Sequence, residues 1–391
     1  MLSPSNLPSW RCESGAPAPK RVVYGDDTLS ADTAYRFMCE GTAVLWQGDF
    51  HNARQLLQAL ARRTQKKSNK KSTQLRNANQ LIDQATDKPQ DTAQTFHLHR
   101  QALGQRARIL GLLLIPVDAQ YRIPLRRAPD VQDACSQAWG PPTGTDCMVS
   151  LRELLGAVGA YEWRKKGVEI PALGDPPQNR IFPHYGVFSP IRGEYIDLVA
   201  DMPLRDKTLA FDIGVGTGVL SALLVKRGVQ RVIATDQDPR ALACAKENLE
   251  RIGVSAKIEL LDTDLFPQGL APLVLCNPPW VPARPTSPIE HAVYDEDSQM
   301  LKGFLSGLRA HLIPEGEGWL ILSDLAEHLG LRSREKLLQW IDEGGLKVLE
   351  RKDIKPRHSK TADTDDPLHM ARASEVTSLW RLGIKHPSHS A

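Results

Sequence analysis

Apolar and polar positions follow a regular alternation in the second half of this chain. Short, nearly continuous apolar runs are separated by stretches in which apolar residues recur every three to four positions. The first pattern is typical of strands that are buried on both faces, and the second of helices that pack one face on a sheet. The pattern predicts strands over 208–214, 231–238, 257–264, 273–277 and 318–324, with helices over 218–228, 239–253 and 298–312.

Repeated strand–helix units predict an α/β fold, namely a Rossmann-like, doubly wound and mostly parallel sheet with helices on both faces. The end of the chain departs from this alternation. Residues 346–354 and 375–384 are typical of two strands, and we see no helix pattern between them. We expect these strands to form an antiparallel edge of the sheet.

The first half of the chain has a different organisation. Residues 1–30 are rich in Pro, Ser and Gly and predict an irregular arm. Residues 31–175 predict a mainly helical domain. The proline-rich stretch 168–183 shows neither the helical nor the strand period, so we place the domain boundary within it. The predicted sheet then occupies a second domain, residues 176–391.

The overall composition excludes several classes of protein. The chain has 391 residues, of which 41% are hydrophobic and 24% charged, as in ordinary globular proteins. Six scattered cysteines without a C-x-x-C pair argue against a disulfide framework and a zinc site. The N-terminus lacks the apolar core of a signal peptide, and the longest apolar run, 109–117, is too short to span a bilayer. We therefore expect a cytoplasmic protein with no membrane partner and no metal.

One segment is strongly basic, although the net charge of the chain is only +3. Residues 62–76 contain seven basic side chains and no acidic one. A solvated linker is one interpretation of such a run. The other is a segment that contacts phosphate groups, which would favour RNA as a partner.

A glycine-rich loop follows the first strand of the predicted sheet. The sequence FDIGVGTG contains Gly214, Gly216 and Gly218, and a helix begins directly after it. Glycines allow a sharp turn and a close approach to a ligand at the helix N-terminus. The dinucleotide fingerprint G-x-G-x-x-G needs a third glycine at the position of Val219, which disfavours a nicotinamide oxidoreductase. Asp236 ends the second strand, where a carboxylate can bind the hydroxyl groups of a ribose.

The tetrad Asn277, Pro278, Pro279 and Trp280 directly follows an apolar strand. Neither proline has an N–H to donate, so the strand must end here. The break leaves an amide side chain, fixed backbone carbonyls and an aromatic face together at the strand end. A plain Pro-Pro turn with a tryptophan that caps the core is the alternative interpretation.

Taken together, FDIGVGTG, ATDQDP and LCNPPW resemble the class I S-adenosylmethionine-dependent methyltransferases in order and spacing. The tetrad resembles that of the N-methyltransferases. Within that class, the chain is similar to the HemK-like glutamine methyltransferases and to the small-domain RNA guanine and adenine methyltransferases. The likeness covers about residues 180–384, and residues 185–199 resemble the segment that covers the cofactor in these families.

The resemblance implies S-adenosyl-L-methionine as the cofactor and a set of residues that bind it. Those residues are Phe188, Asp212, Gly214, Gly216, Thr217, Gly218, Asp236, Gln237, Asp264 and Asn277. Asp264 would lie near the adenine amine, and Asp262 is the other candidate for this position. Asp212 would bind the loop backbone or the amino group of the cofactor.

The resemblance also implies catalytic roles for the tetrad. A planar amide or exocyclic amine nitrogen is a poor nucleophile because its lone pair is delocalised. The Asn277 side-chain carbonyl and the Pro278 backbone carbonyl would each accept one of its N–H hydrogens and turn the lone pair toward the methyl group. Pro279 would stiffen the loop, and Trp280 would stack on the planar substrate.

The resemblance leaves the substrate open. It implies a macromolecule, either protein glutamine or, as an alternative, adenine N6 or guanine N2 of a nucleic acid. The segment SPIRGEY departs from the Pro-Arg-Pro-Glu-Thr pattern of the glutamine enzymes. Residues 31–175 would recognise the substrate, and the long polar connection 283–299 predicts a lid. A catalytically silent scaffold that only binds the cofactor is the alternative of another class.

Overall fold

The computed structural model covers the 391-residue chain and describes residues 8–65, 92–191, 193–285, 288–356 and 366–385. The chain divides into two compact units, Met1–Glu162 and Trp163–Ala391. Within the described ranges, no helix is both long and apolar enough to cross a membrane.

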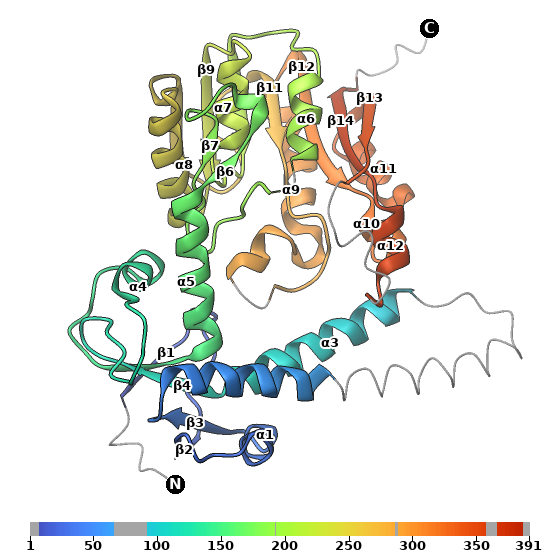
Figure 1. The fold of residues 1–391 in the computed structure, drawn as a ribbon. Helices are drawn as coiled ribbons and strands as arrows, with labels where there is room; N and C mark the ends of the chain where they lie inside the picture. Colours follow the sequence, from blue (N-terminus) through green and yellow to red (C-terminus); the bar gives the residue numbers. More distant parts are fainter. Residues whose placement is uncertain (1–7, 66–91, 192, 286–287, 357–365, 386–391) are drawn as a thin grey trace, which may run out of the picture. The chain divides into compact units, whose positions relative to one another are not determined.

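The second unit contains a seven-stranded sheet in the order β10-β9-β8-β11-β12-β14-β13 (Figure 1). Neighbouring strands from β10 to β12 are parallel, and β14 is antiparallel to both β12 and β13. The predicted Rossmann-like sheet with an antiparallel edge is therefore confirmed. The strands are β8 (Leu209–Ile213), β9 (Arg231–Asp236), β10 (Ile258–Asp262), β11 (Ala271–Cys276), β12 (Leu312–Ser323), β13 (Leu346–Ile354) and β14 (Thr377–Ile384).

Helices cover both faces of this sheet. On one face α6 (Glu194–Asp201), α7 (Val219–Lys226) and α8 (Pro239–Ile252) share a core with inward residues of the strands. On the other face α9 (Gln299–Leu308) and α11 (Arg334–Glu343) form a second core with the alternate residues. Burial on both faces explains why the parallel strands have nearly continuous apolar sequences.

Shorter elements complete the second unit. A six-residue helix, α12, lies between the last two strands, where the sequence indicated none, because six residues are too few to show a helical period. The short elements are β6 (Val168–Glu169), η2 (Pro171–Leu173), β7 (Arg180–Ile181), η3 (Ser255–Lys257), η4 (Pro288–Ala292), η5 (Glu296–Ser298), η6 (Arg309–His311), α10 (Leu325–His328) and α12 (His369–Ser374).

The proline-rich stretch belongs to the second unit. Ile170, Leu173 and Ile181 are each at most 3% exposed and lie in the same core as α7 and α8. The two units divide between Glu162 and Trp163, earlier than the boundary expected from the prolines. Prolines mark a change of backbone conformation, whereas the division between units depends on where the apolar side chains pack.

The first unit is an α/β region, where the sequence predicted mainly helices after an irregular arm. Its five-stranded sheet has the order β1-β5-β4-β3-β2, and β1 and β2 lie within the predicted arm. These strands have only three to five residues, too few to show a clear period. The elements are β1 (Ser9–Arg11), β2 (Arg21–Gly25), α1 (Ala31–Cys39), β3 (Thr42–Trp46), a helix over 50–65, α3 (Thr92–Leu110), β4 (Leu113–Val117), α4 (Gln132–Trp139), β5 (Cys147–Ser150) and α5 (Leu151–Lys166).

The basic run 62–76 lies outside the described residues from position 66 onward. Its first four residues end the helix over 50–65, where the Arg63 Nε lies 2.9 Å from the Asp32 Oδ1. Neither interpretation of the basic run is tested by this contact.

Candidate active site

The glycine loop and the tetrad meet at the edge where the sheet reverses its strand order. β8 lies between β9 and β11, so the connections from this point run in opposite directions along the sheet. The register pairs Ile213 with Cys276. The next residues, Gly214 and Asn277, therefore leave the sheet side by side. In open α/β sheets this position, beyond the carboxyl ends of the strands, is where ligands bind.

The glycine loop is held on the end of β9 by backbone hydrogen bonds. The N–H groups of Gly214 and Val215 donate to the Thr235 carbonyl at 2.9 and 2.8 Å. The Gly216 N–H donates to the Asp236 Oδ2 at 3.0 Å. The loop is thereby fixed between the first two strands before α7 begins.

Two glycines of the loop have different structural roles. Gly216 has a φ of +52°, and a Cβ added there would meet no atom within 4 Å. Gly218 has a φ of +81°, and its added Cβ would lie 3.2–3.3 Å from Leu249 and Ala245 of α8. Gly218 therefore allows α7 and α8 to pack closely, whereas Gly216 exposes the loop backbone to open space.

Thr217 lies between these glycines and is only 4% exposed. Its backbone carbonyl accepts a hydrogen bond from the Asn248 Nδ2 at 3.1 Å. The same amide group bonds the backbone of Phe182, whose N–H donates to the Asn248 Oδ1 at 2.8 Å. Asn248 thus ties the glycine loop to the segment that leads into α6. The sequence signal for it was a polar residue on the apolar face of α8.

Asp236 is placed to bind hydroxyl groups. Its Oδ1 accepts a hydrogen bond from the Asp238 N–H at 3.0 Å, and its Oδ2 accepts the one from Gly216. Burial raises the pKa of this carboxyl, and the backbone hydrogen bonds oppose that effect. Each carboxylate oxygen keeps a second lone pair, so both could still accept a ribose O–H.

The residues proposed near the adenine and the ribose lie in different surroundings. Gln237 follows Asp236 and is exposed. Asp262 pairs with Asp236 in the register of β10 and β9, and Asp264 lies two residues beyond the end of β10. Both of these acids are exposed. The register therefore places Asp262 next to Asp236, the residue expected to bind the ribose. It does not decide whether Asp262 or Asp264 would lie near the adenine amine.

Asp212 is a buried carboxyl beneath the glycine loop. It is 1% exposed, and the Ser221 Oγ donates a hydrogen bond to its Oδ2 at 2.5 Å. Burial raises the pKa of Asp212 to about 7, against the hydrogen bond from Ser221, which lowers it. A cationic group of a ligand would favour the ionised form of this acid. The sequence did not single out Ser221, although it is the one hydroxyl in the apolar sequence of α7.

Glu194 is a second buried acid, and the sequence analysis missed it. It begins α6 and is 3% exposed, and among the described residues its Oε1 has no hydrogen-bond partner. Buried polar atoms in native proteins are nearly always bonded, so this oxygen is an acceptor that a water molecule or a ligand could use. Burial raises the pKa of Tyr195, and both Asp212 and Glu194 add to that rise, so the two acids lie near one phenol. Phe188 lies half-buried in the segment before α6.

In the tetrad, the side chains of Trp280 and Asn277 are joined. The indole Nε1–H of Trp280 donates a hydrogen bond to the Asn277 Oδ1 at 2.9 Å. Pro278 is buried, and Asn277, Pro279 and Trp280 are half-buried. The Trp280 ring packs against the core clusters on both faces of the sheet. Trp280 is therefore anchored in the protein as well as partly exposed.

The connection after the tetrad returns to it. The Val281 N–H donates to the Val293 carbonyl at 3.2 Å, and the Asp295 N–H donates to the Val281 carbonyl at 3.0 Å. The Asp295 carboxylate accepts hydrogen bonds from the N–H groups of Met300 and Leu301 and so caps the start of α9. The lid predicted for 283–299 stays a prediction.

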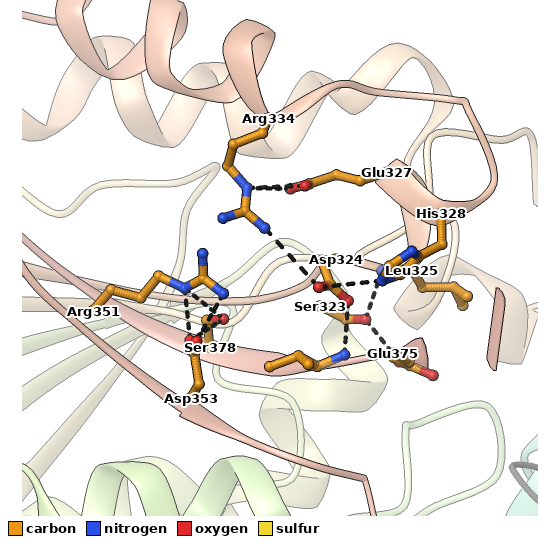
Figure 2. Close-up of polar contacts among 11 residues, drawn as sticks. Ser323, Asp324, Leu325, Glu327, His328, Arg334, Arg351, Asp353, Glu375 and Ser378 are labelled. Atoms are coloured by element: carbon orange, nitrogen blue, oxygen red, sulfur yellow. Dashed lines mark hydrogen bonds and ion pairs between the residues drawn. The ribbon is translucent and has the colours of Figure 1, made fainter. Parts of the chain in front are cut away.

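A polar cluster lies at the end of β12, the strand next to the one that carries Asn277. Figure 2 shows the side chains of Ser323, Asp324 and Glu375 in this cluster. The Ser323 Oγ donates to the Glu375 Oε1 at 2.7 Å, and the Asp324 Oδ1 accepts from the Val376 N–H at 2.7 Å. These bonds join the end of β12 to the start of β14.

Metal ligands do not gather in the part of the chain that the structure describes. In that part no three His, Cys, Asp or Glu side chains are close enough to hold an ion. This edge of the sheet presents hydrogen-bond acceptors, two buried acids and an aromatic ring.

Part of this chain is similar to known proteins. Residues 179–333 match the methyltransferase small domain family. A ribosomal protein L11 methyltransferase of Vibrio parahaemolyticus is 38% identical over 95 residues, which are 24% of this chain and 32% of that protein. The chain spans about a third of the length of the first two L11 methyltransferases that it matches.

Two other relatives carry different names. A candidate protein N5-glutamine methyltransferase of Methanocaldococcus jannaschii is 30% identical over 109 residues, 27% of this chain and 54% of that protein. A tRNA1(Val) (adenine(37)-N6)-methyltransferase of Shewanella loihica is 29% identical over 215 residues, 51% of this chain and 86% of that protein.

The matched residues contain the glycine loop, Asp236 and the tetrad, on a seven-stranded sheet with an antiparallel edge. The part of the chain that carries these features is therefore similar to the methyltransferase small domain family.

Proposed function

We propose that this protein is an N-methyltransferase that transfers a methyl group from S-adenosyl-L-methionine to a planar nitrogen of a macromolecule. The observation that carries the proposal is the adjacency of Gly214 and Asn277 at the switch point of the sheet. It brings a ligand-binding loop and a pair of hydrogen-bond acceptors to one place.

The residues around the glycine loop fit such a cofactor. Asp236 would accept hydrogen bonds from the ribose hydroxyls, and the backbone at Gly216 would approach the ligand closely. Asp212 and Glu194 are buried acids suited to the amino group, since the second has an oxygen without a partner among the described residues. When bound, the cofactor supplies an electrophilic methyl group on a sulfonium.

The tetrad would prepare the attacking nitrogen. An amide or exocyclic amine attacks a methyl group only when its lone pair leaves conjugation. The Asn277 Oδ1 and the Pro278 carbonyl would accept the two N–H hydrogens and direct the lone pair toward the methyl group. The nitrogen would gain the methyl group that the cofactor supplies and would lose one proton to solvent. Positioning of this kind can lower the activation barrier by about 7–11 kcal/mol.

Two substrate classes fit this chemistry. Protein glutamine is the first, and the Methanocaldococcus jannaschii relative bears that name. Adenine N6 of RNA is the second, and the Shewanella loihica relative favours it because this chain covers 86% of that protein. The basic run 62–76 adds support for RNA.

Transfer of labelled methyl decides between these classes. The full chain would be incubated with S-adenosyl-L-[methyl-³H]methionine and with protein and RNA fractions of a lysate. Label in protein that survives ribonuclease supports a protein substrate such as glutamine, and label lost to ribonuclease supports a nucleic-acid base. Binding of the cofactor without transfer to either fraction, or to small molecules, would leave the silent scaffold as the better interpretation.

A further inference from the structure

The tryptophan of the tetrad has a bond that its expected stacking role does not explain. Its Nε1–H donates to the Asn277 Oδ1 at 2.9 Å, the atom proposed to accept a hydrogen from the substrate nitrogen. We propose that Trp280 is a positioning residue, which fixes the Asn277 amide so that its oxygen is presented to the substrate. This inference rests on the proposed function.

The two bonded groups differ in what they can donate and accept. An asparagine amide has a carbonyl oxygen at one end and an N–H₂ group at the other, and a half-turn exchanges them. An indole N–H can only donate. It therefore bonds the oxygen and disfavours the flipped amide, in which two donors would face each other. A flipped Asn277 would present N–H₂ to a substrate N–H and could not accept from it.

The position of the indole is itself fixed by the fold. Trp280 packs against the core of α6, α7 and α8 and also against the core of α9 and α11. Pro278 and Pro279 restrict the backbone between the two bonded side chains. A donor held by two cores can orient a half-buried amide, whereas a ring free to follow the substrate could not.

The bond leaves Asn277 able to act. The carbonyl oxygen has two lone pairs, and the indole uses one of them. The other remains for one N–H of the substrate. Trp280 thus acts through Asn277, in addition to any contact that its exposed part makes with the substrate.

Aspartate at position 277 provides a matched control. A carboxylate has oxygens at both ends, so a half-turn changes nothing and no donor is needed to orient it. If Trp280 orients the amide, Trp280→Phe in the protein with Asn277 should slow single-turnover methyl transfer about tenfold. In the Asn277→Asp variant the same substitution should slow the transfer by less than about threefold. Phenylalanine keeps a flat ring, so loss of stacking alone would slow both backgrounds equally and would overturn the proposal.

The hydrogen bond has a readout that needs neither substrate nor cofactor. The chain has eight tryptophans, and the Trp280 indole N–H resonance is assigned by its disappearance in Trp280→Phe. In Asn277→Ala this resonance should move upfield and its proton should exchange faster with water. An unchanged shift and exchange rate in Asn277→Ala would overturn the proposal. If the bond is present but the wild type methylates neither protein nor RNA, the proposed function fails while the fixed amide stands.

Discussion

The carboxylate of Asp236 accepts a hydrogen bond from the backbone of Gly216 at 3.0 Å, so the acid at the end of β9 also shapes the loop after β8. The two features were separate predictions from the sequence. Their connection means that Asp236 would have two tasks, to hold the glycine loop and to bind the ribose.

Replacement of Asp236 by alanine should therefore weaken cofactor binding by at least the value of one charged hydrogen bond, roughly 1.5–3 kcal/mol. Titration calorimetry with S-adenosylhomocysteine measures this loss. Asp238→Ala is the matched control, because Asp238 is a nearby acid that caps α8 through the Arg240 N–H at 2.9 Å. The control should lower stability slightly and leave the affinity unchanged. Equal losses in both variants would contradict a ribose role for Asp236.

The buried Asp212 should make cofactor binding depend on pH. Its pKa is raised to about 7 by burial, so near pH 6 the carboxyl is mostly protonated. The positive amino group of the cofactor would favour the ionised form, so binding would release the proton. Affinity should then rise as pH increases toward 7, by up to about tenfold per pH unit, and level off above it.

The stability of the cofactor-free protein should depend on pH in the opposite direction. Because the folded pKa of Asp212 lies above its ordinary value, its contribution to stability is fully present below about pH 4 and is lost as pH rises through 7. Asp212→Asn should remove both dependences, since an amide can still accept the Ser221 hydrogen bond. Calorimetry and thermal unfolding between pH 5.5 and 8.5 measure the two effects. An affinity that falls with rising pH would exclude Asp212 as a partner of the amino group.

Much of this site could be predicted from the sequence because it lies at strand ends. Asp236 and Asn277 each follow an apolar run that stops at a turn residue or a proline. Parallel strands bring their carboxyl ends to one edge, so local patterns sufficed to place Asp236 and Asn277 there.

Other parts depend on side-chain contacts that the pattern of apolar and polar residues does not encode. The partner of Asp212 is a serine in the following helix, and the partner of Asn277 is the tryptophan three residues later. Glu194 looks like an ordinary helix-start acid in the sequence, and only its burial marks it. The sheet of the first unit was missed because its strands are short and two of them lie in a stretch rich in Pro, Ser and Gly.

Two glycines of the loop should respond differently to alanine. Gly218→Ala places a Cβ 3.2–3.3 Å from α8 at a φ of +81°, so it should lower the free energy of unfolding by about 2 kcal/mol or more. In Gly216→Ala the new Cβ would meet no other atom, so only the positive φ should lower the free energy of unfolding, by about 1–2 kcal/mol. Its new methyl group would instead occupy the ligand side of the loop and weaken cofactor binding. Urea unfolding and calorimetry on both variants separate the two roles, and an affinity unchanged in Gly216→Ala would place the cofactor elsewhere.

Asn277 should be needed for methyl transfer but not for folding. It is half-buried at the end of β11, so Asn277→Ala should lower the free energy of unfolding only by the value of the lost Trp280 hydrogen bond, about 1 kcal/mol. Loss of one preorganised acceptor at a reacting centre typically slows the reaction by about 10²–10³. Asn277→Asp should be milder, because a carboxylate accepts the same hydrogen bond.

Single-turnover transfer into whichever fraction the wild type labels gives the rates, and calorimetry on the same samples gives the cofactor affinity. The affinity should be unchanged to first order, since Asn277 would act on the substrate. Two results would count against the mechanism in different ways. A normal rate in Asn277→Ala would reduce the tetrad to a turn that ends β11. A normal rate with saturating cofactor but a large loss of affinity would make Asn277 a cofactor ligand, and the nitrogen would then need another acceptor at the end of this strand.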